Sequence, residues 1–292
     1  MALETILKSK SCYLAIIITL QQAAGTISKA CRDELVSRRS GTGTPFKTMS
    51  MFKNKYLFNV TEDLKRYTGL SDSDLARRLT RRGSLHFAAE HAFWEPTNPA
   101  ELRWYYLHSV SYLFANAAHA TNPLCFLLSP EHGPVLDFSG GVGNNVLYLA
   151  QKGVQVTYTG IGQFEFMFTR HRVRQRSLEH KVEFAEPYNA AFELDPLASL
   201  HKPQAYGCIM AFDVLEHIPH FERTVAAMVA ALRPGGMLCE SSPFAEKSGE
   251  NAIHVTNGGI SMQDAMGRQM RQIQFGYRKT SEGAQRCWEK YK

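Results

Sequence analysis

Long apolar runs are scarce in this chain of 292 residues, which argues against a protein that spans a membrane. The run CYLAIIITL, residues 12–20, is much too short to cross a bilayer as a helix. It follows two lysines and precedes SKA at 28–30, so a signal peptide is one interpretation; a transit peptide and an upstream extension are two others. We expect residues 1–50 to be a leader or linker of unknown role, possible targeting included, on a cytoplasmic protein.

Paired cysteines at close spacing are also lacking. The chain has 6 cysteines, with no C-x-x-C pair and no zinc-finger spacing. They are Cys12, Cys31, Cys125, Cys208, Cys239 and Cys287. Several lie in apolar runs, so we expect free buried thiols in a reducing compartment, no disulfide framework and no metal site.

The chain has only a small excess of positive charge. Hydrophobic residues make up 44% and charged residues 21%, which excludes a disordered tail, and the net charge is +6. Two arginine clusters, at 77–82 and 170–176, favour anionic partners such as RNA phosphates. No recognisable RNA-binding module accompanies them, so we expect solvated helix faces and no nucleic-acid partner.

The pattern along the chain divides it into three parts. Residues 38–50 read as a linker, and from about residue 60 apolar side chains recur at helical spacing. Ser71 has the place of a helix N-cap, with Asp74 three residues on. We therefore expect a helical cap over 51–128 and a second domain over 129–292.

The second domain alternates strands with helices. The expected strands are 133–140, 154–161, 181–187, 205–218 and 237–244, and the expected helices are 144–153, 164–179 and 221–236. Residues 270–279 and 284–291 flank a TSEG turn and read as a terminal hairpin. This alternation predicts an α/β, Rossmann-like, doubly wound sheet, mostly parallel and ending in an antiparallel hairpin.

The stretch VLDFSGGVGNN, residues 135–145, is the clearest candidate for a ligand loop. It reads as a strand, an acid and a glycine turn that opens a helix, where parallel sheets bind ligands. The third glycine of a dinucleotide fingerprint is absent. Asp137 would repel a pyrophosphate, but it suits a cofactor that carries an ammonium group, as S-adenosylmethionine does.

A second motif, later in the chain, indicates which family of proteins this loop resembles. AFDVLEHIPH at 211–220, followed by LRPGG at 232–236, resembles class I S-adenosylmethionine-dependent methyltransferases. The resemblance covers roughly residues 100–292, and YYLHSVSYLF at 105–114 is similar to the helical cap of small-molecule methyltransferases. It implies transfer of a methyl group from S-adenosylmethionine to an O, N or S atom of a small molecule.

The resemblance implies roles for the loop residues. Asp137 is expected to hold the amino end of the cofactor's methionine through water, and Gly141 and Gly143 to line that methionine. Gly140 belongs to the same turn, and Ser139 stands where the family usually has glycine. A serine is small enough for this place unless the backbone needs a positive φ.

The resemblance also implies cofactor contacts from later strands. Ala211, Phe212 and Val214, just past the fourth strand, are expected to form the pocket wall near the sulfonium. Glu186, after the third strand, lies close to where the family contacts adenine. The acid that this family carries after the third strand is replaced by the pair at 187–188, Pro-Tyr.

The ribose contact departs from the family pattern. The acid that ends the second strand and binds both ribose hydroxyls is replaced by Gly160. A charge-assisted hydrogen bond contributes about 1.5–3 kcal/mol, so we expect weaker cofactor binding. The alternative is that Gln163 or Glu165 holds the ribose.

Two residues are candidates for catalysis. His217 follows Glu216 beside the expected sulfonium and would act as a general base, although hydrogen bonds that fix the loop are the favoured role for this pair. Tyr106 is an aromatic candidate in the cap, where packing is the favoured role. Trp94, Trp104, Tyr105 and Tyr112 share this region.

Two other functions remain open at this point. The cap would exclude an acceptor if the sulfonium were consumed by internal cyclisation, with release of methylthioadenosine. The missing ribose acid would also fit a degenerate, non-catalytic binding protein. The segment AFDVLEH lacks the N-P-P-Y motif of enzymes that methylate base amines. The acceptor and the oligomeric state are not readable from the sequence.

Overall fold

The computed structural model describes residues 59–80, 113–114, 116–117, 121–186, 197–218, 220–242, 244, 258–280 and 283–292. All of these belong to one compact unit, Asn54–Lys292. The expected leader at 1–50 and the Pro-Tyr pair at 187–188 lie outside the described residues. The aromatic candidates of the cap lie outside them too: Trp94, Trp104, Tyr105, Tyr106 and Tyr112.

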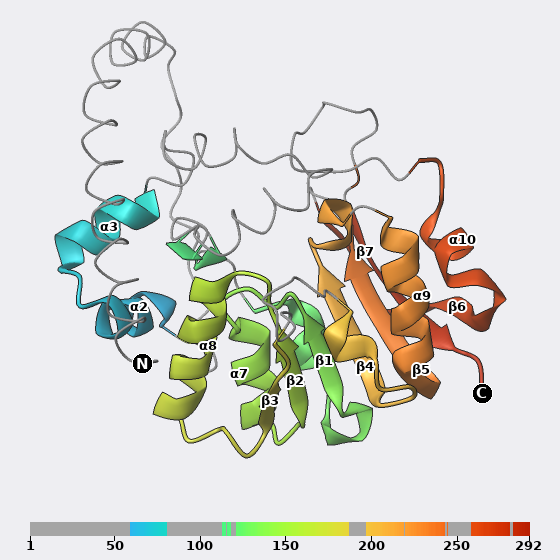
Figure 1. Ribbon diagram of the computed structural model, residues 1–292, viewed down its shortest axis with the longest axis horizontal. Coiled ribbons are helices and arrows are strands. Elements are labelled where there is room, and N and C mark those ends of the chain that lie inside the picture. The colour runs from blue at the N-terminus through green and yellow to red at the C-terminus, as the bar shows by residue number, and fades with distance from the viewer. Residues whose placement is uncertain are drawn as a thin grey trace, which may run out of the picture. The chain divides into compact units, whose positions relative to one another are not determined.

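A seven-stranded sheet forms the centre of the domain (Figure 1). Its strands are β1 (Val135–Phe138), β2 (Val156–Thr159), β3 (Val182–Phe184), β4 (Tyr206–Phe212), β5 (Leu232–Ser241), β6 (Met270–Thr280) and β7 (Gly283–Lys290). The order is β3-β2-β1-β4-β5-β7-β6. The first five strands are parallel, and β7 is antiparallel to both β5 and β6. The predicted sheet and its terminal hairpin are therefore confirmed.

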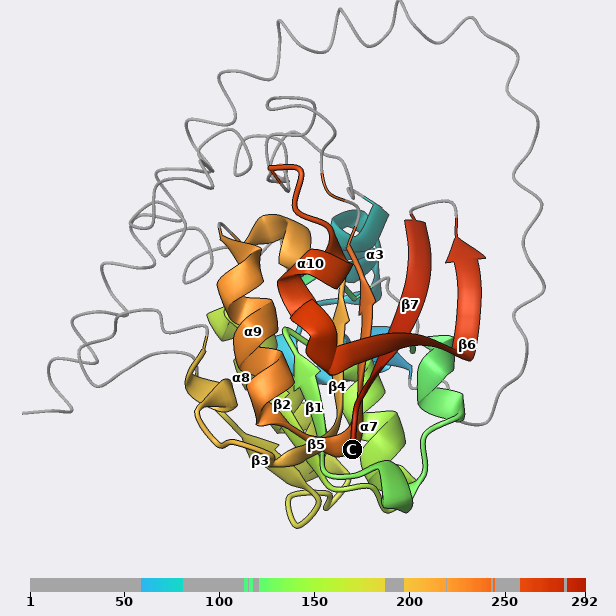
Figure 2. The same cartoon turned by 90° about the vertical axis from the view of Figure 1, so that its right-hand side faces the viewer.

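Helices cover both faces of the sheet, with α7 and α9 on opposite sides of the strands (Figure 2). The helices of this part are α7 (Asn144–Gln151), α8 (Gln163–Gln175), α9 (Phe221–Ala231) and α10 (Met262–Met266). Short 3₁₀ segments are η1 (Pro123–Phe126), η2 (Pro130–His132), η3 (Ala198–Leu200), η4 (Leu215–His217) and η5 (Gly267–Gln269). Val135 of β1 packs with α7, and Leu136 packs with α9. Burial on both faces explains why the strand VLDF is a continuous buried run.

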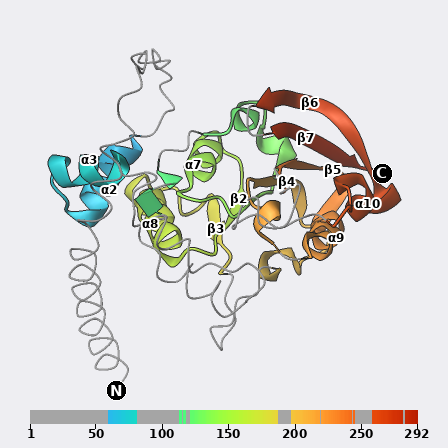
Figure 3. The same cartoon turned by 90° about the horizontal axis from the view of Figure 1, so that it is seen from above.

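Two helices of the expected cap lie beside α8 (Figure 3). They are α2 (Val60–Thr68) and α3 (Asp72–Thr80). The N-cap predicted at Ser71 is confirmed, since its Oγ accepts from the Asp74 backbone N–H at 3.2 Å. Leu64 and Leu75 of these helices pack with Phe168 of α8. The cap boundaries at 51 and 128 stay a prediction.

The segment LRPGG differs from the expected helix end. Helix α9 ends at Ala231, and β5 already begins at Leu232. Leu232 pairs with Tyr206 of β4, and after a shift in register Met237 pairs with Cys208. The proline and glycines do stop the helix, but pairing with β4 on both sides of them extends the strand through the motif.

The expectation of free thiols is wrong for one pair of cysteines. Cys239 and Cys287 form a disulfide, because they stand directly opposite each other on antiparallel β5 and β7, with Cα atoms 4.2 Å apart. Cys125 and Cys208 are free and buried, as expected. Cys12 and Cys31 lie outside the described residues.

Candidate functional site

The turn between β1 and α7 has an unusual backbone. Gly141 and Gly143 have φ values of 53° and 75°, and Ser139 has a φ of 60°. The sequence left open whether Ser139 needs a positive φ, and the structure shows that it does. A non-glycine residue in the left-handed region is strained by about 1–3 kcal/mol. The turn therefore carries strain at the point where the sheet order reverses.

Side chains from β2 and α8 hold this turn in place. Tyr158 donates its hydroxyl hydrogen to the Gly141 carbonyl at 2.6 Å, and Thr169 donates to the same oxygen at 3.2 Å. A Cβ atom on Gly140 would overlap the Asp137 carboxylate, and one on Gly143 would overlap Thr169. The glycines are therefore required by the packing around the turn.

Asp137 lies beneath the turn and is 2% exposed. Its Oδ2 atom has no hydrogen-bond partner among the residues that the structure describes. Burial raises the pKa of this carboxyl to about 7, against a hydrogen bond from Asn145 that lowers it. A buried carboxylate oxygen without a donor fits the ammonium group, or the bridging water, of a cofactor that ends in an amino acid.

The end of β2 lacks the family's acid, as the sequence indicated. The strand ends at Thr159, and Gly160 follows without a positive φ. The Tyr158 hydroxyl lies 2.5 Å from where a Cβ atom of Gly160 would be. A side chain at position 160 would therefore overlap Tyr158 unless one of them shifts, a restriction that nothing in the sequence indicated.

The two alternative ribose residues differ in burial. Gln163 is exposed at the start of α8, whereas Glu165 is 4% exposed. Glu165 accepts a hydrogen bond from Asn116, and its Oε1 lies 3.9 Å from the Cβ position of Gly141. Burial raises the pKa of Glu165 to about 8, opposed by the bond from Asn116. Of the two, Glu165 therefore lies against the glycine turn.

The other expected cofactor residues lie in different surroundings. Ala211 and Phe212 are the last residues of β4 and do not follow it, and Val214 comes two residues later. Ala211 and Val214 are buried in the cluster that packs under α9, and Phe212 is partly buried. Glu186 is exposed, with a carboxylate oxygen 4.0 Å from Arg170. Their contacts with a cofactor stay predictions.

An acidic group lies beyond the end of β4. Glu216 is 1% exposed, and its Oε2 atom has no hydrogen-bond partner within the described part of the chain. Burial raises its pKa to about 8, with further contributions from Asp213 and Glu240. His217 Nε2 lies 3.7 Å from Glu216 Oε1, and the imidazole side chain is 12% exposed. The structure thus brings together a histidine and a carboxyl that could share a proton.

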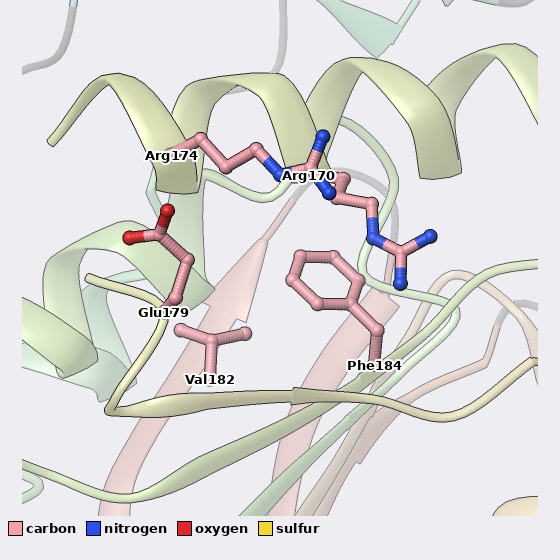
Figure 4. Close-up of a pocket in the computed structure, with 5 residues that line it drawn as sticks. All are labelled: Arg170, Arg174, Glu179, Val182 and Phe184. Carbon is pink, nitrogen blue, oxygen red and sulfur yellow. The ribbon is translucent and has the colours of Figure 1, made fainter. Parts of the chain in front are cut away.

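We predicted that the arginine cluster at 170–176 forms a solvated helix face. That prediction is wrong for part of the cluster. Arg172 is fully buried, and Arg176 pairs with Asp63. Arg170 and Arg174 instead reach from α8 over Phe184 and Val182 of β3 (Figure 4). With Glu179 they line an open pocket of about 250 Å³. None of these five lining residues belongs to the glycine turn or to β4.

The described residues contain no helix that is long and apolar enough to cross a membrane. They also contain no group of three His, Cys, Asp or Glu side chains that could hold a metal ion.

Comparison with known proteins matches this chain to a protein family. A family model described as a methyltransferase domain matches residues 107–277, more than half of the chain. The curated protein "Methyltransferase GfsG" of Streptomyces halstedii is 32% identical over 108 residues. That match covers 36% of this chain and 35% of the relative, so the chain spans about a third of that relative's length.

Solved structures resemble the fold at low identity. The 1,6-didemethyltoxoflavin-N1-methyltransferase of Burkholderia thailandensis, solved with S-adenosylhomocysteine, has a TM-score of 0.42 and 17% identity. That alignment covers 59% of this chain and 78% of the other. TehB of Haemophilus influenzae has a TM-score of 0.41 and 14% identity over 54% of this chain and 57% of the other. At these values neither carries an argument about the reaction.

Proposed function

Because the chain belongs to the methyltransferase-domain family, we propose that it transfers a methyl group from S-adenosylmethionine to an oxygen, nitrogen or sulfur atom of a small molecule. The cofactor brings a methyl group that its sulfonium already activates. The protein's own contribution is to bind the cofactor, to align the acceptor and to receive the proton that the acceptor loses.

The buried Asp137 Oδ2 atom, which has no hydrogen-bond donor among the described residues, lies beneath the glycine turn and is the observation that carries the proposal. A buried carboxylate oxygen without a hydrogen-bond donor costs stability, and a ligand that supplies an ammonium group or an ordered water compensates that cost. Helix α7 begins at Asn144, and its N-cap Gly143 makes no side-chain cap hydrogen bond, so this helix N-terminus suits the carboxylate of the same ligand. Both ends of an amino-acid moiety thus find complementary groups.

The ribose contact would come from Glu165. Glu165 stands in the first turn of helix α8, which follows the end of β2 where the family's ribose-binding acid is missing. Its carboxylate lies against the glycine turn between β1 and α7. With a pKa of about 8, it is protonated in the free protein at neutral pH and can donate as well as accept a hydrogen bond. This supports a ribose held from the helix in place of the strand end.

His217 would accept the acceptor's proton, and Glu216 would become the compensating charge where it gives up its own proton, since burial raises its pKa to about 8. The 3.7 Å separation of His217 Nε2 and Glu216 Oε1 lets a carboxylate stabilise a protonated imidazole. The partial exposure of His217, against the full burial of Glu216, leaves the imidazole as the group that a substrate can reach.

The test follows a methyl label. The full chain is incubated with S-adenosylmethionine labelled at its methyl group and with a pool of cellular small molecules. We expect label in a small molecule and an equal amount of S-adenosylhomocysteine by mass spectrometry, and neither product with Asp137→Ala. Methylthioadenosine in place of S-adenosylhomocysteine would instead support internal cyclisation. If calorimetry shows that the chain binds neither S-adenosylmethionine nor S-adenosylhomocysteine, the proposal is contradicted.

A further inference from the structure

A buried ion pair joins the cap to the Rossmann-like part of the chain. Asp63 of α2 and Arg172 of α8 are 3% and 0% exposed, and Arg172 Nε donates to Asp63 Oδ2 at 2.8 Å. Arg176 donates to both carboxylate oxygens of Asp63, each at 2.8 Å. Burial lowers the pKa of Arg172 only to about 10, so the guanidinium stays charged at neutral pH.

The other side of the Arg172 guanidinium faces the glycine turn. Its Nη1 donates to the Val142 carbonyl at 2.5 Å and to Asn144 Oδ1 at 2.8 Å. Val142 lies between the two glycines with positive φ, and Asn144 is the first residue of α7. Arg172 therefore connects a cap carboxylate directly to the backbone of the turn.

The Val142 side chain gives a second, independent link. It is 3% exposed and packs in one apolar cluster with Leu64 of α2, Leu75 of α3 and Phe168 of α8. The carbonyl and the side chain of the same turn residue are thus both held by groups that depend on the cap.

Stability alone does not explain this arrangement. A buried ion pair can often be replaced by apolar residues with no loss of stability, because the charges must be taken out of water. What apolar residues cannot replace is the directed hydrogen bond to the Val142 carbonyl. That bond fixes the orientation of one peptide plane between two glycines with positive φ, in a turn that also contains the strained Ser139.

We propose that Asp63 and Arg172 are positioning residues through which cap helix α2 holds the glycine turn in its cofactor-binding conformation. This inference rests on the cofactor role of the turn given under the proposed function. It makes cofactor affinity depend on docking of α2, although neither side chain needs to touch the cofactor. By linkage, cofactor binding must then tighten the docking of α2.

The test separates positioning from stability. The double variant Asp63→Leu/Arg172→Leu keeps a packed apolar contact and removes the bond to Val142. We expect a folded variant whose melting temperature falls because the buried Val142 carbonyl loses its donor. Well below that temperature, calorimetry should show a dissociation constant for S-adenosylhomocysteine raised at least about fivefold. Arg176→Gln is the matched control, because it removes a partner of Asp63 and leaves the bond from Arg172 to Val142. Its dissociation constant should stay within about twofold of the parent's.

A folded double variant that binds as tightly as the parent would overturn the inference and leave the proposed function intact. A parent that does not bind S-adenosylhomocysteine would overturn both. If the double variant does not fold, hydrogen exchange of the parent decides the question. Addition of S-adenosylhomocysteine must then slow amide exchange in Val60–Thr68, and unchanged exchange there would contradict the inference.

Discussion

At the scale of single residues, Ser139 combines a left-handed backbone with a side chain that disfavours it. Its φ of 60° lies where glycine alone is unstrained. The residue therefore adds strain next to the carboxyl of Asp137, in a turn that a ligand is expected to fill. Natural proteins store strain of this kind at binding sites more than elsewhere.

We expect Ser139→Gly to raise the free energy of unfolding by about 1 kcal/mol, because it removes the strain of a positive φ. The gain from relieved strain is partly offset by the greater freedom of glycine in the unfolded chain. Urea denaturation measures the change, and Ser177→Gly, at a φ of 53° outside the turn, is the comparison. A clear loss of stability at Ser139 would show that the serine side chain makes a contact that outweighs the strain.

Gly160 is limited by a single neighbour. A Cβ atom there would lie 2.5 Å from the hydroxyl of Tyr158, which is fully buried and cannot move aside cheaply. We expect Gly160→Ala to cost about 1–3 kcal/mol through overpacking. In Tyr158→Phe the same alanine should cost much less, so a double-mutant cycle should show coupling of at least about 1 kcal/mol. Additive effects of the two changes would contradict this packing.

At the scale of elements, a buried ion pair between β5 and β7 links the terminal hairpin to the parallel sheet, beside the strand pairing and the disulfide. Glu240 of β5 is fully buried and accepts from Arg286 Nε of β7 at 2.7 Å and from the Trp288 indole at 3.3 Å. Burial raises the pKa of Glu240, and Arg286 opposes that shift. The pair lies next to the Cys239–Cys287 disulfide, at the edge where the sheet turns antiparallel.

Removal of Arg286 should leave the buried charge of Glu240 without its partner and so destabilise the folded protein. We expect Arg286→Met to lower the free energy of unfolding by about 3–5 kcal/mol, measured by urea denaturation. The control is Arg271→Met, which breaks the exposed pair with Glu289 between β6 and β7 and should cost far less, because solvent screens exposed charges. Equal costs for the two variants would mean that burial does not distinguish the pairs.

The elements themselves could be predicted, since periodicity and turn residues fix them locally. The run VLDF and the alternation of strands and helices pointed to β1 and the parallel sheet, and the TSEG turn to the hairpin. The disulfide and the start of β5 at Leu232 could not be predicted, because strand pairing and register are not local properties. The glycine turn was located from sequence, but the Asp63–Arg172 pair, 109 residues apart, leaves no local signal.

At the scale of the whole molecule, buried acids should set the response of stability to pH. Burial raises the pKa of Asp137 to about 7 and those of Glu165 and Glu216 to about 8. Above their ordinary pKa values the unfolded chain has released these protons while the folded chain still holds them. Each group then lowers stability as pH rises, by at most about 1.4 kcal/mol per pH unit.

We therefore expect the free energy of unfolding to fall between about pH 5 and about pH 7. Urea denaturation across this range measures the slope, and Glu165→Gln should reduce it by removing one of the three groups. Stability that rises steadily over the same range would contradict the protonated, buried state of these carboxyls.

Asp137 keeps one buried carboxylate oxygen without a donor among the described residues, and we propose that this oxygen serves the amino end of S-adenosylmethionine. Asp137→Asn tests it most directly, because the claim requires two opposite effects. Removal of a buried charge should raise the free energy of unfolding of the free protein by about 1 kcal/mol or more at about pH 8. The same change should weaken binding of S-adenosylhomocysteine at least about tenfold by calorimetry, with an unchanged circular dichroism spectrum. A variant that binds as tightly as the parent would contradict the assignment of this turn to the cofactor.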